Sequence, residues 1–310
     1  MGTSTREPLE HSDEVASLLF CAGEQSAARV AARLPETARS TPHVILPMAG
    51  FGRRFKEEGY IKDKPLIEVG GRTLLHWSLS CLSPRYVSLG WEVIPVLRVS
   101  QPVEWIIDEI SIRVHVTPGR ARAVVLSGPT QGAACSVLAA AVGLPPDDPV
   151  LVMNADQWFK FEGLRTEGTG TIADNLRQDV KDLQGLTNWA MLQQWDGFIL
   201  TFPGKGPAWS YAVTNGTNRV VHVIEKKEVS PYATVGVYWW RRAGDLVRSI
   251  CAMIAVGQKT NQEFYMAPAY NFLPLSDKNV QIVQVEEFMG LGTPEQVRAF
   301  EARLAGGWTP

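Results

Sequence analysis

The chain has 310 residues, 45% hydrophobic and 20% charged, so it can bury one large α/β core or a core with a small appendage. Its formal net charge of −2 at pH 7 gives no basic field for nucleic acid, so we expect a small-molecule partner in a locally positive cleft. No apolar run approaches the ~18 residues of a membrane span, and the N-terminus lacks the pattern of a secretory signal. We therefore expect a cytoplasmic protein with no membrane partner.

The first predicted element is an N-terminal helical extension, residues 1–40, in which Val15–Leu34 is Ala-rich with helical spacing. This helix either packs on its own domain or serves docking or dimerisation, so a homo-oligomer stays open. Residues 41–310 are expected to form one domain. In its first half strands at Val44–Leu46, Glu92–Val99, Ile112–Val116, Val124–Leu126 and Pro149–Met153 alternate with helices at Thr73–Leu82, Gln101–Ile110 and Gly132–Val142.

This alternation of strands and helices implies a parallel sheet with right-handed crossovers. Residues 162–196 are polar and are predicted to be a helical insertion. The second half looks more antiparallel, with strands at Gly197–Phe202, Tyr211–Thr214, Val220–Ile224 and Thr234–Trp240 and helices at Asp245–Ala255 and Pro294–Leu304. The predicted fold is therefore α/β, a Rossmann-type three-layer fold with a mixed, mainly parallel central sheet.

The scattered cysteines and histidines give little sign of chemistry. Four cysteines without a C-x-x-C pair suit reduced thiols better than disulfides, a zinc site or a nucleophile: Cys21, Cys81, Cys135 and Cys251. Lone histidines are more often structural than catalytic, so none of these is assigned as a base: His43, His76, His115 and His222.

The most informative segment is His43–Val69, in which an apolar strand runs into a glycine turn with two arginines. Gly50 and Gly52 allow positive φ and a close approach of backbone N–H groups to an anion. Arg53, Arg54 and Lys64 add cations that can offset the charges of a nucleoside triphosphate. The segment therefore predicts a loop that wraps a polyphosphate.

Neither a dinucleotide fingerprint nor a Walker loop is present, because Phe55 stands where the third glycine is required and no G-K-[ST] follows. The segment instead resembles the A-x-G-x-G-T-R-[LF] and P-K-P signature of sugar-phosphate nucleotidylyltransferases. Two positions depart, since Arg53 replaces Thr and Asp63 replaces the first Pro. The resemblance implies a GT-A-like fold with Arg54 and Lys64 as catalytic cations.

Asp156 in the segment LVMNADQWF follows an apolar strand, at the edge of the sheet where α/β proteins bind ligands. The resemblance, closest to a capsule-type branch of the family, implies that Asp156 is catalytic and binds Mg²⁺. A plain alternative is that its side chain caps the following turn. The family's second metal acid is absent, because Gly290 stands at its position in FMGLGTPE, so the ion would rely on Asp156 and phosphates or borrow Glu286 or Glu287.

The remaining motifs supply the substrate contacts that the resemblance implies. Gly128–Ala134 resembles the family segment that holds the base, and the implied nucleotide contacts are Met48, Ala49, Gly50, Gly52, Arg53, Gln131 and Gly132. Val223–Trp240 resembles the acceptor motif E-K-P, and NQEFYMAPAYN resembles an acceptor run of the capsule-type branch; together they imply contacts from Glu225, Lys226, Lys227, Gly236, Glu263, Tyr265 and Asn271. Only one of the two neighbouring lysines can point into the cleft.

These segments imply a nucleotidylyltransferase that moves NMP from an NTP, with CTP slightly favoured, to a sugar 1-phosphate or a related phosphorylated or phosphonate metabolite. Its products would feed cell-surface polymer or specialised-metabolite assembly. Two alternatives stay open: a non-catalytic nucleotide-binding regulator and a GT-A glycosyltransferase.

Overall fold

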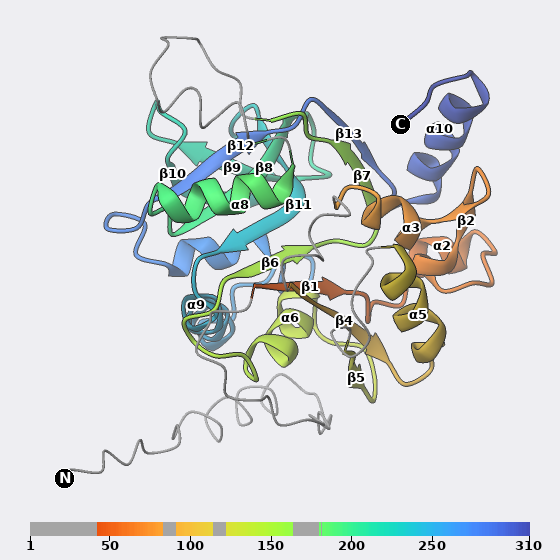
Figure 1. Cartoon of the computed structure of the whole chain (residues 1–310), viewed down its shortest axis with the longest axis horizontal. Helices are drawn as coiled ribbons and strands as arrows, with labels where there is room; N and C mark the ends of the chain where they lie inside the picture. The colour runs from red at the N-terminus through yellow and green to blue at the C-terminus, as the bar shows by residue number, and fades with distance from the viewer. Residues whose placement is uncertain (1–41, 83–90, 114–121, 164–179, 181) are drawn as a thin grey trace.

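The computed structural model describes residues 42–82, 91–113, 122–163, 180 and 182–310 (Figure 1). Three predicted segments fall wholly or partly outside the described residues: the helix Val15–Leu34, residues 114–116 of a predicted strand, and residues 164–179 and 181 of the predicted insertion. The division into an N-terminal extension and one main domain therefore stays a prediction.

A nine-stranded mixed sheet forms the centre of the molecule, with the strand order β10-β9-β11-β6-β1-β4-β5, while β8 pairs with β11 and β12. The strands are β1 His43–Pro47, β4 Glu92–Arg98, β5 Val124–Leu126, β6 Val150–Met153, β8 Gly197–Pro203, β9 Ser210–Thr214, β10 Val220–Glu225, β11 Tyr232–Trp240 and β12 Val280–Gln284. The four strands from the first half of the chain, β6, β1, β4 and β5, run parallel. β11 pairs antiparallel with β6 and β8 and so joins the two halves.

The register of the parallel strands explains their continuous apolar sequences. Ile45 pairs with Ile94 of β4 and with Val152 of β6, and all three belong to the hydrophobic cluster on one face of the sheet. Their neighbours Val44 and Leu46 belong to the cluster on the other face. Because both faces are covered, the residues inside these strands are apolar at every position rather than at every second one, and polar residues stand only at strand ends, as His43, Glu92 and Arg98 do.

Helices cover both faces of the sheet. One face packs against α6 Ala133–Ala141, α9 Ala243–Ala255 and the 3₁₀ helix η2 Ala267–Phe272. The other packs against α3 Leu74–Leu79, α5 Val103–Arg113 and α8 Leu183–Leu192, and α8 is the described helix of the predicted insertion. The predicted three-layer α/β fold around a mixed sheet is confirmed. Ile112, however, belongs to α5 and not to a strand: α5 is anchored by the buried Ile106 and Ile110, and Ile112 lies on its exposed side.

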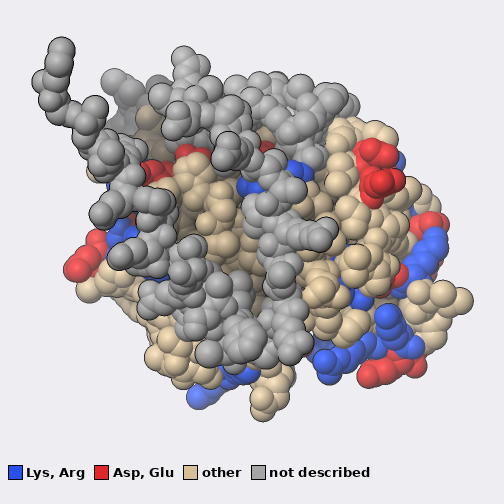
Figure 2. All heavy atoms as spheres, turned by 90° about the horizontal axis from the view of Figure 1, so that it is seen from below, with Lys and Arg blue, Asp and Glu red and all other residues tan. Residues whose placement is uncertain are grey.

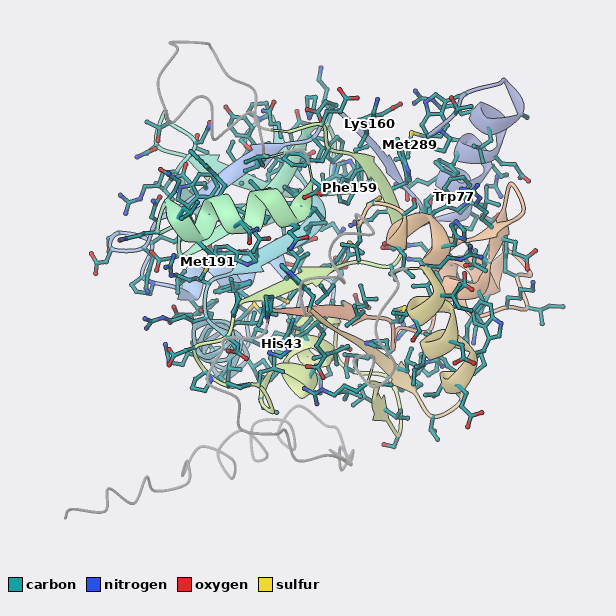
Figure 3. The ribbon with its side chains drawn as sticks, in the orientation of Figure 1. His43, Trp77, Phe159, Lys160, Met191 and Met289 are labelled. Atoms are coloured by element: carbon teal, nitrogen blue, oxygen red, sulfur yellow. The ribbon has the colours of Figure 1, made fainter. Side chains whose placement is uncertain are left out.

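A third cluster beside the main sheet was not predicted. The two-stranded antiparallel sheet of β7 Gln157–Lys160 and β13 Glu287–Gly290 packs there with α2 Arg53–Glu57 and α10 Pro294–Ala305. Two short elements, η1 Lys64–Leu66 and the β2–β3 hairpin of Glu68–Val69 and Arg72–Thr73, border it. Phe159 and Lys160 of β7 lie near Met289 of β13 in Figure 3, in agreement with the pairing of Met289 with Trp158.

The described surface has no strong charge asymmetry on the face seen in Figure 2, where acidic and basic side chains lie interspersed. No helix among the residues that the structure describes has the length and apolarity to cross a membrane.

Candidate active site

A cleft of about 710 Å³ opens where β1 and β6 end, and β9, β10 and β11 line its other side. Most residues predicted from sequence line it: Met48, Ala49, Gly50, Gly52, Arg53, Arg54, Lys64, Gly132, Asp156, Glu225, Lys226, Gly236, Glu263 and Tyr265. Gln131, Lys227 and Asn271 do not. The folded chain thus brings together residues that are up to 217 positions apart, from Met48 to Tyr265.

The glycine turn after β1 forms one wall of the cleft. Gly52 has φ 63°, in the left-handed region that favours glycine, and its carbonyl accepts hydrogen bonds from Phe55 N at 3.0 Å and Lys56 N at 3.2 Å. A Cβ on Gly52 would lie 3.1 Å from Cβ of Lys64, so the turn packs directly on the lysine. Arg53 and Arg54 begin α2 and line the cleft.

Lys64 and Asp156 meet in the cleft as an ion pair between Lys64 Nζ and Asp156 Oδ2. Lys64 Nζ also donates to the carbonyl of Gly292 at 3.3 Å, and the two charged side chains are 23% and 26% exposed. A Cβ on Gly292 would lie 3.2 Å from Asp156 Oδ2, so the glycine leaves the carboxylate accessible. Asp156 is therefore an acid of the cleft with a cationic partner, and its described contact is not a turn cap.

The segment predicted to bind the base lies at the start of α6. Gly132 has φ 131°, and a Cβ there would lie 2.5 Å from the carbonyl oxygen of Phe264, so only glycine fits. Thr130 Oγ1 donates to the carbonyl of Gly132 at 2.8 Å and lies 2.7 Å from Ser136 Oγ. Gln131 is turned away from the cleft, where its Oε1 accepts a hydrogen bond from Lys259 Nζ at 2.5 Å.

Glu225 and Lys226 form the opposite wall. Glu225 accepts a hydrogen bond from Ser210 Oγ and lies 3.3 Å from Lys226 Nζ. Lys226 Nζ also donates to the carbonyl of Ala208 at 2.8 Å and lies 5.0 Å from the ring centroid of Tyr265. Lys226 has φ 60°, a strained conformation for a non-glycine residue, which these contacts hold in place.

Gly236 gives this wall its shape. Its φ is 95°, and a Cβ would lie 2.4 Å from Asn154 Nδ2 and 2.5 Å from Gln157 Oε1. The amide side chains of Asn154 and Gln157 therefore occupy the space that a side chain at position 236 would fill. Asn154 and Gln157, which flank Asp156 in the segment LVMNADQWF, thus add polar groups to the cleft.

Tyr265 presents a neutral phenol. Burial, reinforced by the nearby carboxylates of Glu263 and Glu225, raises the pKa of Tyr265 to about 12, although Arg54 acts in the opposite direction. The phenol therefore stays protonated at neutral pH and can donate a hydrogen bond to a bound acceptor.

Asn271 has a structural position. Its Oδ1 accepts from Val223 N at 2.8 Å and its Nδ2 donates to Val223 O at 2.7 Å, so the amide joins η2 to β10. Among the cleft residues that sequence reasoning missed, Trp209 and Phe288 form an aromatic wall with Phe202, with ring centroids 4.2–5.4 Å apart. Trp209 precedes β9 and Phe288 lies in β13, so no local pattern reveals their contact.

His43 and Cys81 have structural surroundings, as expected. His43 is buried at the start of β1, away from the cleft (Figure 3), with Nδ1 2.8 Å from Glu92 and Nε2 3.0 Å from Asp148. Burial raises the pKa of the Cys81 thiol to about 12, and its Sγ accepts a hydrogen bond from Phe159 N.

Asp156 is suited to a divalent ion whose other ligands are mainly phosphate oxygens of the substrate. A Cβ on Gly290 would lie 2.8 Å from Gln296 Nε2 and 2.9 Å from Trp209 Cη2, so the position of the missing acid is filled. Glu287 pairs with Arg303 and Glu286 accepts from Glu162 N, and neither lines the cleft. Across the described ranges no group of three or more His, Cys, Asp or Glu side chains could hold a metal ion. Mg²⁺ is commonly bound by one or two carboxylates plus substrate phosphates, which this arrangement allows.

Comparison with known families shows which class of domain the glycine turn and Asp156 resemble. Residues 44–164, which include the glycine turn, Lys64 and Asp156, match the model of the MobA-like NTP transferase domain. The prediction that this part of the chain resembles nucleotidyltransferases is thereby confirmed. No curated protein sequence matches the chain.

Solved structures show that the similarity in fold extends beyond the matched residues. A nucleoside-diphosphate-sugar pyrophosphorylase from Vibrio cholerae RC9 is 22% identical, with a TM-score of 0.64 over 84% of this chain and 99% of that one. A putative glucose-1-phosphate thymidylyltransferase from Bacillus anthracis is 15% identical, with a TM-score of 0.62 over 87% and 97%. A UDP-glucose pyrophosphorylase complexed with UDP-glucose is 13% identical, with a TM-score of 0.61 over 86% and 100%.

Proposed function

We propose that this protein moves the nucleoside monophosphate of an NTP to a phosphorylated small molecule and releases pyrophosphate. The acceptor is a sugar 1-phosphate or a related phosphate or phosphonate metabolite, CTP is the favoured donor, and the reaction takes place in the cytoplasm. The observation that carries the proposal is the Lys64–Asp156 ion pair, which lies beside the glycine turn in the cleft.

The reaction is an in-line displacement at the α-phosphorus. An oxygen of the acceptor phosphate forms a bond to the α-phosphorus, and the bond from that phosphorus to the bridging oxygen of the β-phosphate breaks with its electron pair. The acceptor phosphate is an anion at neutral pH, so no general base is needed. Catalysis then depends on alignment and on neutralisation of the charge that develops on the α-phosphate.

Lys64 and Arg54 are the cations placed for that role. In the free protein Lys64 is paired with Asp156, and we propose that it exchanges the carboxylate for an α-phosphate oxygen when the nucleotide binds. Asp156 would then be free to bind a Mg²⁺ held by the triphosphate, and the ion would supply further neutralisation of phosphate charge. The wall of Gly50, Gly52 and Arg53 wraps the β- and γ-phosphates.

The opposite wall is suited to the acceptor. Lys226 supplies a positive charge for its phosphate, while Glu225 and the Tyr265 phenol supply hydrogen bonds for hydroxyl groups. The cleft therefore has cations for two phosphate-bearing substrates and polar groups for a hydroxylated acceptor.

The test is release of pyrophosphate by the purified protein with Mg²⁺, each NTP in turn and a panel of phosphorylated sugars and phosphonates. Release that requires one acceptor and one NTP is the expected result, and mass spectrometry should find the NMP–acceptor conjugate. Nucleotide binding without turnover would mean a regulator, the alternative that the filled position at Gly290 favours. Release of a free NDP from a nucleotide sugar would instead identify a glycosyltransferase.

A further inference from the structure

Arg98 is a buried cation beside the glycine turn that the proposed reaction does not use. It ends β4, its side chain is 5% exposed, and it does not line the cleft. Its Nη2 donates to Asp63 Oδ1 at 2.9 Å, and the guanidinium carbon lies 4.8 Å from the centroid of the Phe51 ring. A guanidinium is rarely buried unless it is paired, so these contacts account for its position.

The phosphate-binding segment, residues 48–64, contains both partners of Arg98. Phe51 stands between Gly50 and Gly52 at the tip of the turn, and Asp63 immediately precedes Lys64. The planar guanidinium group of Arg98 thus joins the tip of the turn to the residue before Lys64.

The backbone of the same strand end holds the start of the turn. Arg98 N donates to Gln101 Oε1 at 2.7 Å, and Gln101 Nε2 donates to the carbonyl of Met48 at 3.2 Å. The end of β4 therefore contacts the phosphate-binding segment at its beginning, at its tip and just before Lys64.

Asp63 stands where the P-K-P signature has proline, and the structure explains how the chain tolerates the change. Its φ of −59° and ψ of 144° are angles that proline itself adopts, so the backbone keeps the same conformation. The carboxylate is bonded to Arg98, while Lys64 pairs with Asp156. The restriction that a proline ring would supply is replaced by an ion pair with a buried partner.

We propose that Arg98 is a positioning residue for nucleotidyl transfer, which acts through Asp63 and Phe51 to fix Lys64 relative to the glycine turn. The proposal rests on the proposed function, because its kinetic effect needs a turnover in which Lys64 and the turn bind the same triphosphate. A displacement of a catalytic group by about 1 Å can cost about 100-fold in rate.

The first experiment is a double-mutant cycle of Arg98→Met and Asp63→Pro, with Arg219→Met as the matched control. Arg219 also serves a structural role, since its Nη2 donates to three carbonyl oxygens, but it lies outside the cleft. With activity measured well below each unfolding temperature, R98M should lower kcat/KM for the NTP by about 10- to 100-fold and change KM for the acceptor little. R219M should lower the unfolding temperature without this kinetic loss.

The cycle also tests whether Arg98 acts through Asp63. If the two residues form one unit, the loss in D63P/R98M should be no larger than the loss in R98M alone. Additive losses, or an R98M protein with unchanged kcat/KM for the NTP, would overturn the proposal. Should R98M fail to fold, Asp63→Asn decides instead, because it removes the ion pair at the less buried partner without supplying a proline ring. A loss of kcat/KM for the NTP in D63N supports the proposal, and an unchanged value would overturn it.

The second experiment tests whether Arg98 holds the phosphate-binding segment in place, and it does not depend on enzyme turnover. Amide hydrogen exchange of residues 50–66 should rise in R98M and not in R219M, and calorimetry should show weaker binding of CTP or whichever NTP binds the wild type. If the wild type binds nucleotide but never releases pyrophosphate, the proposed function fails while the exchange and binding measurements still decide the role of Arg98. Unchanged amide exchange and unchanged nucleotide affinity in R98M would overturn the proposed role of Arg98.

Discussion

Replacement of Lys64 by methionine is the sharpest test of the proposed chemistry, since it removes one charge and keeps most of the side-chain length. An ion pair at about 4 Å is worth about 4 kcal/mol at an effective dielectric constant near 20, and about 1 kcal/mol in water. The Lys64 and Asp156 side chains are about one quarter exposed, so their pairing in the free protein lies between these limits. A preorganised cation facing charge that grows in the transition state is worth about 2.7–4 kcal/mol.

We therefore expect K64M to lower kcat by about 10²- to 10³-fold, while the free energy of unfolding changes by about 1 kcal/mol, because water can reach the Asp156 carboxylate. The assay is single-turnover release of pyrophosphate at saturating NTP and acceptor. The matched control is Lys62→Met, two residues earlier, whose side chain is 57% exposed and pairs with Glu68 at 2.6 Å. Surface pairs of this kind contribute about 0–1 kcal/mol, so K62M should keep its rate. A folded K64M protein with a rate within about threefold of wild type would refute the role of the lysine.

Three further predictions address the shape, the metal and the pH response of the site. Gly236→Ala should destabilise the protein by about 2 kcal/mol or more, because Gly236 has a positive φ and a Cβ there would lie 2.4 Å from a neighbouring atom. Gly128→Ala is the control, because a Cβ on Gly128 would meet nothing within 4 Å. Equal unfolding temperatures of the two variants would contradict the packing argument. Mn²⁺, used as a probe for Mg²⁺, should bind measurably by electron paramagnetic resonance only after an NTP is added. Gly290→Asp should lower the unfolding temperature, because the new side chain would clash with Trp209, and it should not create a metal site that works without nucleotide. Tight Mn²⁺ binding to the wild type or to this variant without nucleotide would refute this reading. Because the pKa of Tyr265 is raised to about 12, the unfolded phenol ionises from about pH 10 while the folded one stays neutral; stability should fall between these values and fall less in Tyr265→Phe, as urea unfolding at several pH values would show.

The first half of the chain was readable because its signals are local. Apolar strands covered on both faces, glycines that permit unusual φ and cations next to them are patterns of neighbouring residues, and the structure places Gly52, Arg54, Lys64 and Asp156 in one cleft accordingly. The sequence could not show that Lys64 and Asp156 pair with each other in the free protein, because 92 positions separate them.

The acceptor wall was harder to predict, because it depends on which way strand side chains point and on pairing between distant strands. Lys226 lines the cleft and Lys227 does not, a choice that alternation left open. Asn271 belongs to a polar run that resembles an acceptor motif, yet both ends of its amide bond to the backbone of Val223. Trp209 lines the cleft beside Phe288, a contact between residues far apart in the sequence.

The pairing of β7 with β13, two strands far apart in the sequence, has a consequence for how the protein is made. Gly292, which follows β13, accepts a hydrogen bond from Lys64, and Leu291 N donates to the carbonyl of Asp156 at 2.8 Å. Arg298 of α10 then pairs with Glu58, 240 positions earlier, at 2.6 Å. During synthesis, the nucleotide-handling wall therefore emerges from the ribosome before these supports, which are missing until residues 291–298 have been translated. A nascent chain that stalls before Gly292 would carry every predicted catalytic side chain and still lack the contacts that complete their arrangement.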